Sequence, residues 1–316
     1  MNLPSFSDAR VLVVGDAMLD RYWLGDVDRI SPEAPVPVVA VAEQQARAGG
    51  AANVAQNIAS MSANATLLCV TGDDASADEL EALLTAEHVG TALIREVGAR
   101  TTEKFRVLAR NQQLIRLDFD HEPGEPALAN LQQKFQDLLG STDVLVLSDY
   151  GKGVLTHVQD LIEAARAADK PVVVDPKGND FDRYRGATII TPNWSEFVAV
   201  VGDCDSELKF HSCAQELRES LELQMLLVTR GDKGMTLFRE GNAASDLPAK
   251  ATEVFDVSGA GDTVVASFAL ALAAGMNDMD SLHFANTAAG VVVRKIGTAT
   301  VSLDEINTAF KTGKGI

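Results

Sequence analysis

Short apolar segments alternate with amphipathic helical segments through most of this 316-residue chain. Such alternation predicts a parallel β-sheet in an α/β fold. The apolar segments are nearly continuous, as expected of strands whose two faces are both covered by helices. We expect strands at residues 10–14, 65–70, 144–147, 172–174, 188–190 and 226–229, and helices at 50–62, 75–88, 127–139, 156–168, 195–201, 213–221, 261–274 and 281–295.

Two segments interrupt this alternation and do not suit a parallel core sheet. The first is rich in proline, and the second alternates apolar with polar residues on both sides of a polar turn, as a β-hairpin does. We expect a small second β-sheet, a lid on one domain that comprises residues 1–316. The lid is expected from about residues 21–42 and 100–119, with a Pro-rich strand at 35–39 and a hairpin of 104–109 and 113–119 that turns at 110–112.

The expected hairpin has one basic and one apolar face. Period-2 alternation places Lys104, Arg106 and Arg110 together on the basic face. This charge could bind an anionic ligand, or it could only protect an exposed edge strand from pairing with another chain. The apolar face could pair two lids across a homodimer.

The net charge and the cysteine content restrict the partners and surroundings of the protein. A formal net charge of −18 argues against nucleic acid or an anionic membrane as a partner, since both require a basic surface. The three cysteines form no C-x-x-C pair, which suits the reducing cytoplasm, and no apolar run approaches the length of a membrane span. The histidines lack the spacing of a zinc site. We expect a cytoplasmic protein that binds anions through local groups of Lys and Arg.

Two glycines and a carboxylate directly precede the apolar run of the expected helix 261–274. Gly259, Ala260 and Gly261 would let backbone N–H groups point at an anion, and the N-terminus of the helix adds partial positive charge. Asp262 could also accept a proton at this position. A structural turn in which Asp262 only complements the helix dipole explains the segment alone equally well.

Acidic and small residues near the N-terminus form a second candidate site. Asp16 and Asp20 follow the first strand, and ligands of open α/β sheets bind where the strands end. Their carboxylates could accept hydrogen bonds from sugar hydroxyls, or they could be capping or surface groups. Gly49, Gly50 and Asn53 open a helix, where small residues allow either a ligand or another segment to approach closely.

A third candidate segment joins a short strand to a helix near residue 193. Asn193 and Glu196 have the spacing of a capping box, which satisfies free helix N–H groups without any ligand. Glu196 could instead organise magnesium-bound water beside nucleotide phosphates, because hard divalent cations use few carboxylates there.

Two further strand ends carry polar or basic groups. Thr229, Gly231 and Gly234 form a turn whose donors could reach phosphates, although a plain turn explains them almost as well. Lys177 follows another strand and could place a cation at the same edge of the sheet.

These segments occur together and in one order. The Gly-Gly-Ala-Ala-Asn, Asn-x-x-Glu, Thr-x-Gly-x-x-Gly and Gly-Ala-Gly-Asp segments resemble the ribokinase or PfkB family of sugar kinases over nearly the whole chain. The resemblance implies a ribokinase-like α/β fold: a doubly wound, mainly parallel sheet with helices on both faces and a small β-sheet lid. It also implies ATP with Mg²⁺ as cofactors and phosphoryl transfer to a sugar hydroxyl.

The same resemblance assigns roles to individual residues. It makes Asp262 the catalytic base, and Gly259, Ala260 and Gly261 the anion hole. Ser258 stands where Thr is more usual, and Arg230 replaces a commonly apolar residue. The resemblance further implies nucleotide contacts from Asn193, Ser195, Glu196, Thr229, Gly231, Gly234 and Asn286, magnesium held through water at Glu196, and K⁺ or another monovalent cation at Asp256, as in some relatives.

Longer stretches are similar to one branch of this family, the bacterial kinases of D-glycero-β-D-manno-heptose 7-phosphate, which serve ADP-heptose and lipopolysaccharide core synthesis. The branch implies phosphorylation of the anomeric hydroxyl to the 1,7-bisphosphate. In many bacteria this kinase is fused to a nucleotidyltransferase, whose His-x-Gly-His site is absent here, so we expect a stand-alone kinase or one kinase half. The stretches are residues 15–22, 29–37, 110–118 and 148–153, and the residues expected to hold the 7-phosphate are Lys104, Arg106, Arg110 and Lys177.

Other functions remain open at this point. The chain could phosphorylate another sugar or sugar phosphate, such as a fructose phosphate. It could also be a non-catalytic regulator that binds sugar or nucleotide, although the presence of Asp262 argues against that. A Rossmann dehydrogenase is disfavoured because no Gly-x-Gly-x-x-Gly follows the first strand.

Overall fold

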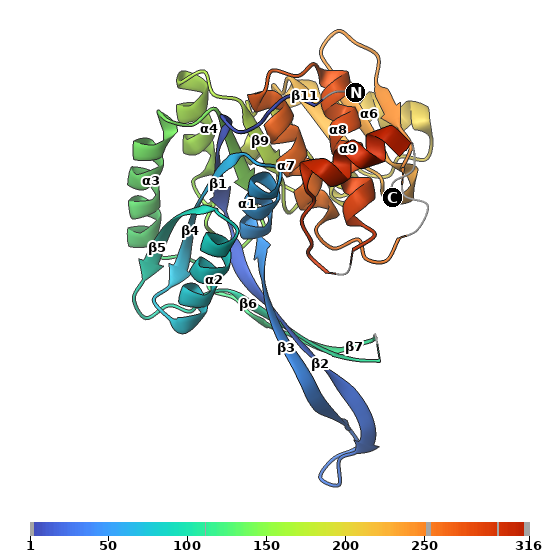
Figure 1. Cartoon of the computed structure of the whole chain (residues 1–316). Helices are drawn as coiled ribbons and strands as arrows, with labels where there is room; N and C mark the ends of the chain where they lie inside the picture. The colour runs from blue at the N-terminus through green and yellow to red at the C-terminus, as the bar shows by residue number, and fades with distance from the viewer. Residues whose placement is uncertain (1–2, 111, 251–253, 296, 313–316) are drawn as a thin grey trace.

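A mostly parallel sheet forms the centre of the protein (Figure 1). The computed structural model describes residues 3–110, 112–250, 254–295 and 297–312, and within them nine strands pair in the order β13-β12-β11-β10-β9-β8-β1-β4-β5. All neighbours from β11 to β5 pair in parallel, whereas β12 and β13 run antiparallel. The strands are β1 Arg10–Gly15, β4 Asn64–Gly72, β5 Gly90–Glu96, β8 Val144–Ser148, β9 Val172–Asp175, β10 Ile189–Ile190, β11 Met225–Thr229, β12 Met235–Arg239 and β13 Ser245–Leu247.

Helices cover both faces of this sheet and bury one hydrophobic core on each (Figure 1). Successive residues of β1 point to the two cores in turn. Val11 and Val13 pack into the core with α1, α7 and α8. Leu12 and Val14 pack into the core with α3, α4 and α6. The sheet is therefore doubly wound. The helices are α1 Ala51–Ser60, α2 Ala75–Ala86, α3 Glu125–Leu139, α4 Val158–Ala167, α5 Trp194–Val201, α6 Glu207–Ser220, α7 Ala260–Ala273, α8 Asp278–Val292 and α9 Leu303–Thr312.

A second sheet of order β3-β2-β6-β7 projects away from this body as the lid (Figure 1). The expected hairpin is present, and the two longest strands extend the lid beyond the expected limits of about 21–42. They do so because β2 and β3, despite two register shifts nearer the tip, stay paired back to Ala17 and Gly50, so the lid begins at the candidate sugar site. Its strands are β2 Ala17–Ile30, β3 Pro37–Gly50, β6 Glu103–Ala109 and β7 Gln112–Phe119.

The inner face of the lid carries only part of the expected basic group. Lys104 lies opposite Asp20 and Arg106 opposite Tyr22 in the β2–β6 register, so these side chains share one face. Arg110 instead lies past the end of β6 in a turn with a φ of 48°, 69% exposed, where it contacts Asp28. Six residues of extended strand separate it from Lys104 by about 20 Å. The expectation that Arg110 joins the other two cations is wrong for this reason.

Several elements differ from the sequence-based expectation. Strands β5, β12 and β13 and helix α9 were not expected; β5 is only partly buried, and Ile306 and Ala309 place α9 in a core. Asn111 of the expected hairpin turn lies outside the described residues. Among the helices that the structure describes, none combines the length and apolar character needed to cross a bilayer.

Candidate active site

A pocket of about 190 Å³ lies where the parallel strands end at their carboxyl termini. Ligands of open α/β sheets bind at this edge. Segments that are far apart in the sequence meet there, and most come from the predicted nucleotide and catalytic segments. The predicted residues that line the pocket are Lys177, Asn193, Glu196, Thr229, Gly259, Gly261 and Asp262.

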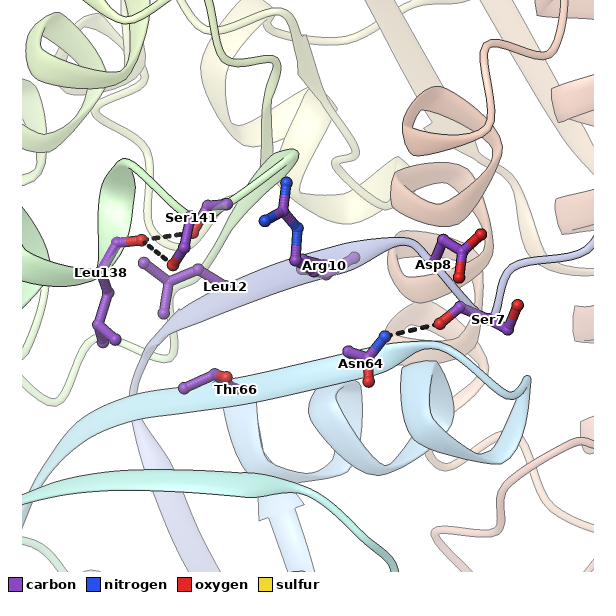
Figure 2. A pocket seen from close by; sticks show the side chains of 10 residues that line it. Ser7, Asp8, Arg10, Leu12, Asn64, Thr66, Leu138 and Ser141 are labelled. Carbon is purple, nitrogen blue, oxygen red and sulfur yellow. Dashed lines mark hydrogen bonds between the residues drawn. The ribbon is translucent and has the colours of Figure 1, made fainter.

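A larger cavity of about 580 Å³ lies elsewhere, at the amino-terminal ends of β1 and β4 (Figure 2). Its polar groups already pair with one another: Asn64 donates to the carbonyl of Ser7, and the hydroxyl of Ser141 to the carbonyl of Leu138. None of the predicted site residues lines this cavity. We therefore assign the chemistry to the smaller pocket at the carboxyl ends of the strands.

The start of helix α7 supplies the candidate anion hole. Gly259 is the N-cap residue, with a φ of 78°, and no side chain caps the helix. The first N–H groups of a helix lack intrahelical acceptors, so an uncapped N-terminus can bind an anion. A Cβ atom at Gly259 would lie 3.0 Å from Asn53 Nδ2, so glycine is required both for the backbone conformation and for this close approach.

Asp262 lies in the first turn of α7 and is held at both oxygens. Tyr150 Oη donates to Oδ1 at 2.7 Å, and Asn53 Nδ2 donates to Oδ2 at 2.5 Å. Burial raises the pKa of Asp262, while these two hydrogen bonds oppose the increase. A buried carboxylate with a raised pKa is a stronger base than an exposed one, which suits proton removal from a hydroxyl.

Asp16 does not lie as a free acceptor for sugar hydroxyls. It is 1% exposed, and its two oxygens accept backbone N–H groups of Tyr150, Lys152 and Val154 at 2.8 to 3.0 Å. The geometry assigns Asp16 to anchoring the loop of residues 149–154, in place of the expected sugar contact.

Asp20 lies at the base of the lid and faces the basic residues of β6. Its carboxylate is buried and accepts from Arg106 Nη1 at 2.7 Å. A Cβ atom at Gly49 would lie 2.6 Å from Asp20 Oδ2, and one at Gly50 would lie 2.3 Å from the carbonyl oxygen of Asp16. The Gly-Gly pair thus allows the two acidic segments to approach the start of α1.

The predicted magnesium segment forms the capping box that its spacing also predicted. Glu196 N donates to Asn193 Oδ1 and Asn193 N donates to Glu196 Oε2, each at 3.0 Å, while Ser195 is exposed in the same turn. Lys177 Nζ lies 2.9 Å from the other carboxylate oxygen, Glu196 Oε1. Lys177 therefore lies beside the nucleotide segment, at the sheet edge where its place after a strand predicted it.

Sequence reasoning missed Asp175, which lines the same pocket. Burial, and next the charges of Asp262 and Glu196, raise its pKa well above the ordinary value. Tyr150 was also missed as a functional residue. Its only signal was the resemblance of residues 148–153, because its contact with Asp262 spans 112 positions of the sequence.

Arg230, which stands where an apolar residue is more common, lies in the turn after β11 and packs against aromatic rings. Its guanidinium lies 5.3 Å from the ring centre of Trp194 and 4.6 Å from that of Phe210, and it pairs with Glu207 at 2.5 Å. Arg230 thus packs as a largely apolar residue would. Thr229 lines the pocket, while Gly231 and Gly234 bound a short 3₁₀ turn with φ values of 61° and 88°.

Two further predicted residues lie on α8 and in the loop before α7: Asn286 belongs to α8, and Asp256 precedes α7. Asn286 is buried and donates to the carbonyl of Pro248 at 3.0 Å. Asp256 accepts from the backbone N–H groups of Ser258 and Gly297 at 2.9 and 2.8 Å. Although burial acts to raise the pKa of Asp256, these hydrogen bonds hold it below the ordinary value, so a charged carboxylate is maintained beside the anion hole.

A buried carboxylate, an uncapped helix start and the basic residues of the lid form an arrangement that suits phosphoryl transfer to a small molecule. The chain belongs to the pfkB family of carbohydrate kinases, whose family profile matches residues 8–306. It is 53% identical over 314 residues to the bifunctional protein HldE of Chromohalobacter salexigens, and 52% over 315 residues to that of Pseudomonas aeruginosa. These alignments cover 99% and 100% of this chain, which spans only 66% of the length of either relative.

Solved structures share the fold at lower identity. Phosphofructokinase-2 from Escherichia coli in complex with potassium has a TM-score of 0.82 at 22% identity, over 96% of this chain and 98% of that chain. Ribokinase of Arabidopsis thaliana complexed with ribose and ATP has a TM-score of 0.77 at 22% identity, with the same coverage. The predicted ribokinase-like fold is confirmed.

Proposed function

We propose that this protein transfers the γ-phosphoryl group of ATP to the anomeric hydroxyl of D-glycero-β-D-manno-heptose 7-phosphate. The observation that carries the reaction is the buried Asp262 beside the uncapped start of α7. The two basic residues of the inner lid face, Lys104 and Arg106, support an acceptor that already bears a phosphate. Identity above 50% to HldE proteins over the whole chain supports the choice of sugar. The reaction belongs in the cytoplasm, where ATP is available.

In the proposed mechanism Asp262 accepts the proton of the anomeric hydroxyl as its oxygen bonds to the γ-phosphorus. The bond from that phosphorus to the β–γ bridging oxygen breaks, and ADP leaves. Base assistance contributes about two to four powers of ten in rate, so positioning and charge stabilisation must contribute more. The backbone N–H groups of Gly259 and Gly261, with the dipole of α7, would stabilise the charge on the transferred group. Ala260 N donates to the carbonyl of Val257 at 3.2 Å and would join them by exchanging that partner.

The acidic and polar residues of the pocket fit the cations that such a reaction uses. Glu196 offers carboxylate oxygen beside the nucleotide turn, as magnesium prefers, and the ion would neutralise charge on the nucleotide phosphates. Thr229, Gly231 and Gly234 would line the nucleotide, with Asn286 near adenine. Asp256 keeps its charge next to the anion hole and would hold a monovalent cation, as potassium accompanies Escherichia coli phosphofructokinase-2.

A turnover assay on a panel of acceptors tests this function. ADP release should be rapid with heptose 7-phosphate and far slower with unphosphorylated heptose, ribose and fructose 6-phosphate. Comparable turnover with fructose 6-phosphate would favour the alternative of a kinase for another sugar phosphate. Binding of ATP without turnover on any acceptor would favour the non-catalytic regulator.

Replacement of Arg106 by Ala tests the phosphate contact of the lid. We expect the KM for the sugar phosphate to rise at least about thirtyfold, because a charged contact of this kind is worth 2 kcal/mol or more, while the KM for ATP stays within about threefold. Arg95→Ala removes the same charge from an ion pair with Asp78 and Glu81 and serves as the control. Equal changes in both KM values would contradict the assignment.

The outer face of the lid supports a homodimer. Trp23, Phe105, Ile115 and Leu117 share this face, where Ile115 is 50% and Leu117 44% exposed. Exposed apolar patches of this kind mark protein contacts. Leu117→Asp should convert a dimer into a monomer in sedimentation velocity, whereas the same change at the exposed Leu208 on α6 should not. A wild-type protein that sediments as a monomer at micromolar concentration would contradict this proposal.

A further inference from the structure

Tyr150 lies between the proposed catalytic base and the lid. Its hydroxyl donates to Asp262 Oδ1 at 2.7 Å, and its ring lies 5.6 Å from Lys104 Nζ on β6. It also lines the pocket at the carboxyl ends of the strands. One side chain therefore contacts the carboxylate that would remove the proton and the cation that would face the substrate.

Hydrogen bonds to two buried carboxylates hold the loop of residues 149–154, which carries Tyr150. Asp16 accepts the backbone N–H of Tyr150 itself at 2.8 Å, together with two further N–H groups of the same loop. Asp149 accepts from Gly151 N at 2.7 Å and from Tyr184 Oη at 2.8 Å. A side chain on so well anchored a backbone has little freedom, as a group that orients another residue requires.

We propose that Tyr150 is a positioning residue that aims the carboxylate of Asp262. Two donors, Tyr150 and Asn53, bind the two oxygens separately and fix the plane of the carboxylate, while each oxygen retains a lone pair for the acceptor hydroxyl. The ring of the same tyrosine lies 5.6 Å from Lys104 Nζ, whose positive charge acts on Asp262 to lower its pKa. This inference rests on the proposed role of Asp262.

The pH dependence of the reaction gives a readout that a merely structural tyrosine would not change. The groups around Asp262 are Asn53 on α1, Asp20 on β2, Lys104 on β6, Asp175 at the end of β9 and Tyr150 itself. The Tyr150 hydrogen bond stabilises the charged carboxylate, so its loss should raise the pKa of Asp262 further. Protonation would then inactivate the base at higher pH, and the acid limb of kcat/KM should move upward.

Steady-state kinetics of Tyr150→Phe across pH test the inference. The variant keeps the ring over Lys104 and loses only the hydroxyl. We expect kcat to fall about tenfold or more, since a hydrogen bond to a charged group is worth roughly 1.5–3 kcal/mol, with little change in either KM and with the acid limb at higher pH. A wild-type kcat with an unmoved acid limb would overturn the proposal.

Two further variants keep the test decisive. Tyr184→Phe removes a buried hydroxyl from Asp149 in the same loop, so it should lower the melting temperature without moving the acid limb. If it moves that limb equally, loop loosening explains the effect and Tyr150 has no special role. Absence of wild-type turnover on heptose 7-phosphate would defeat the proposed function, and substantial turnover by Asp262→Asn would defeat the base role on which the inference rests. Inactive Asp262→Asn with a wild-type-like Tyr150→Phe would defeat only the positioning role.

Discussion

Asp262→Asn is expected to reduce kcat by at least about two to four powers of ten, the usual contribution of a general base, with little effect on ATP binding. Asparagine has nearly the same shape and can still accept the hydrogen bond of Tyr150, but its amide cannot take a proton. The expected loss therefore lies in the chemical step. ADP release with saturating substrates measures it, and calorimetric titration with ATP checks that the nucleotide still binds.

The same substitution should not destabilise the fold. Burial raises the pKa of Asp262, so the unfolded chain ionises this group more readily than the folded protein does. The folded state thus loses stability as pH rises through the unfolded pKa, and the neutral amide removes this loss at pH 7. The amide also turns a donor toward Asn53 or Tyr150, both of which donate to Asp262, and this offsets the gain. A melting temperature close to that of the wild type is therefore expected. Loss of activity supports the base role only if the variant is folded, so its melting temperature is measured alongside. Asp8→Asn makes the same chemical change at an exposed position and serves as the control for expression and purification.

Local sequence signals predicted the parts of the site that depend on neighbouring residues. The Gly259–Asp262 segment begins a helix as expected, because its glycines and the apolar run after it determine that turn. The capping box of Asn193 and Glu196 is present because both hydrogen bonds span only three residues. The alternation of apolar strands and helices likewise predicted the doubly wound sheet, because a strand that is buried on both faces has a nearly continuous apolar sequence.

The errors concern partners that lie far apart in the sequence. Asp16 looked like a sugar ligand because it ends a strand, but its partners are backbone N–H groups more than 130 positions away. Lys177 lies at the predicted edge of the sheet, but no local pattern indicated that it pairs with Glu196. Alternation gave the right face for Lys104 and Arg106, yet it carried no information on where the strand ends, and Arg110 lies beyond that end. Long-range pairing is set by tertiary packing, which no local pattern records.

Asp16→Ala is expected to lower the free energy of unfolding by about 3 kcal/mol, because it leaves one buried and two partly buried backbone N–H groups without their charged acceptor. The loss is expected to be below the sum of three such bonds, because burial, which raises the pKa of Asp16, already offsets part of their effect. For a chain of this length the melting temperature should fall by roughly 5 °C or more. Thermal unfolding followed by circular dichroism measures the change.

The two interpretations of Asp16 predict different results for this variant. If Asp16 anchors the loop, kcat should fall together with stability, because Tyr150 loses its backbone support and no longer orients Asp262. If Asp16 instead binds sugar hydroxyls, the KM for the sugar phosphate should rise while the melting temperature stays near that of the wild type. Asp16→Asn keeps one acceptor oxygen but turns an amide donor toward backbone donors, so anchoring predicts an intermediate stability. Asp8→Ala, on the exposed approach to β1, should change the free energy of unfolding by less than about 0.5 kcal/mol.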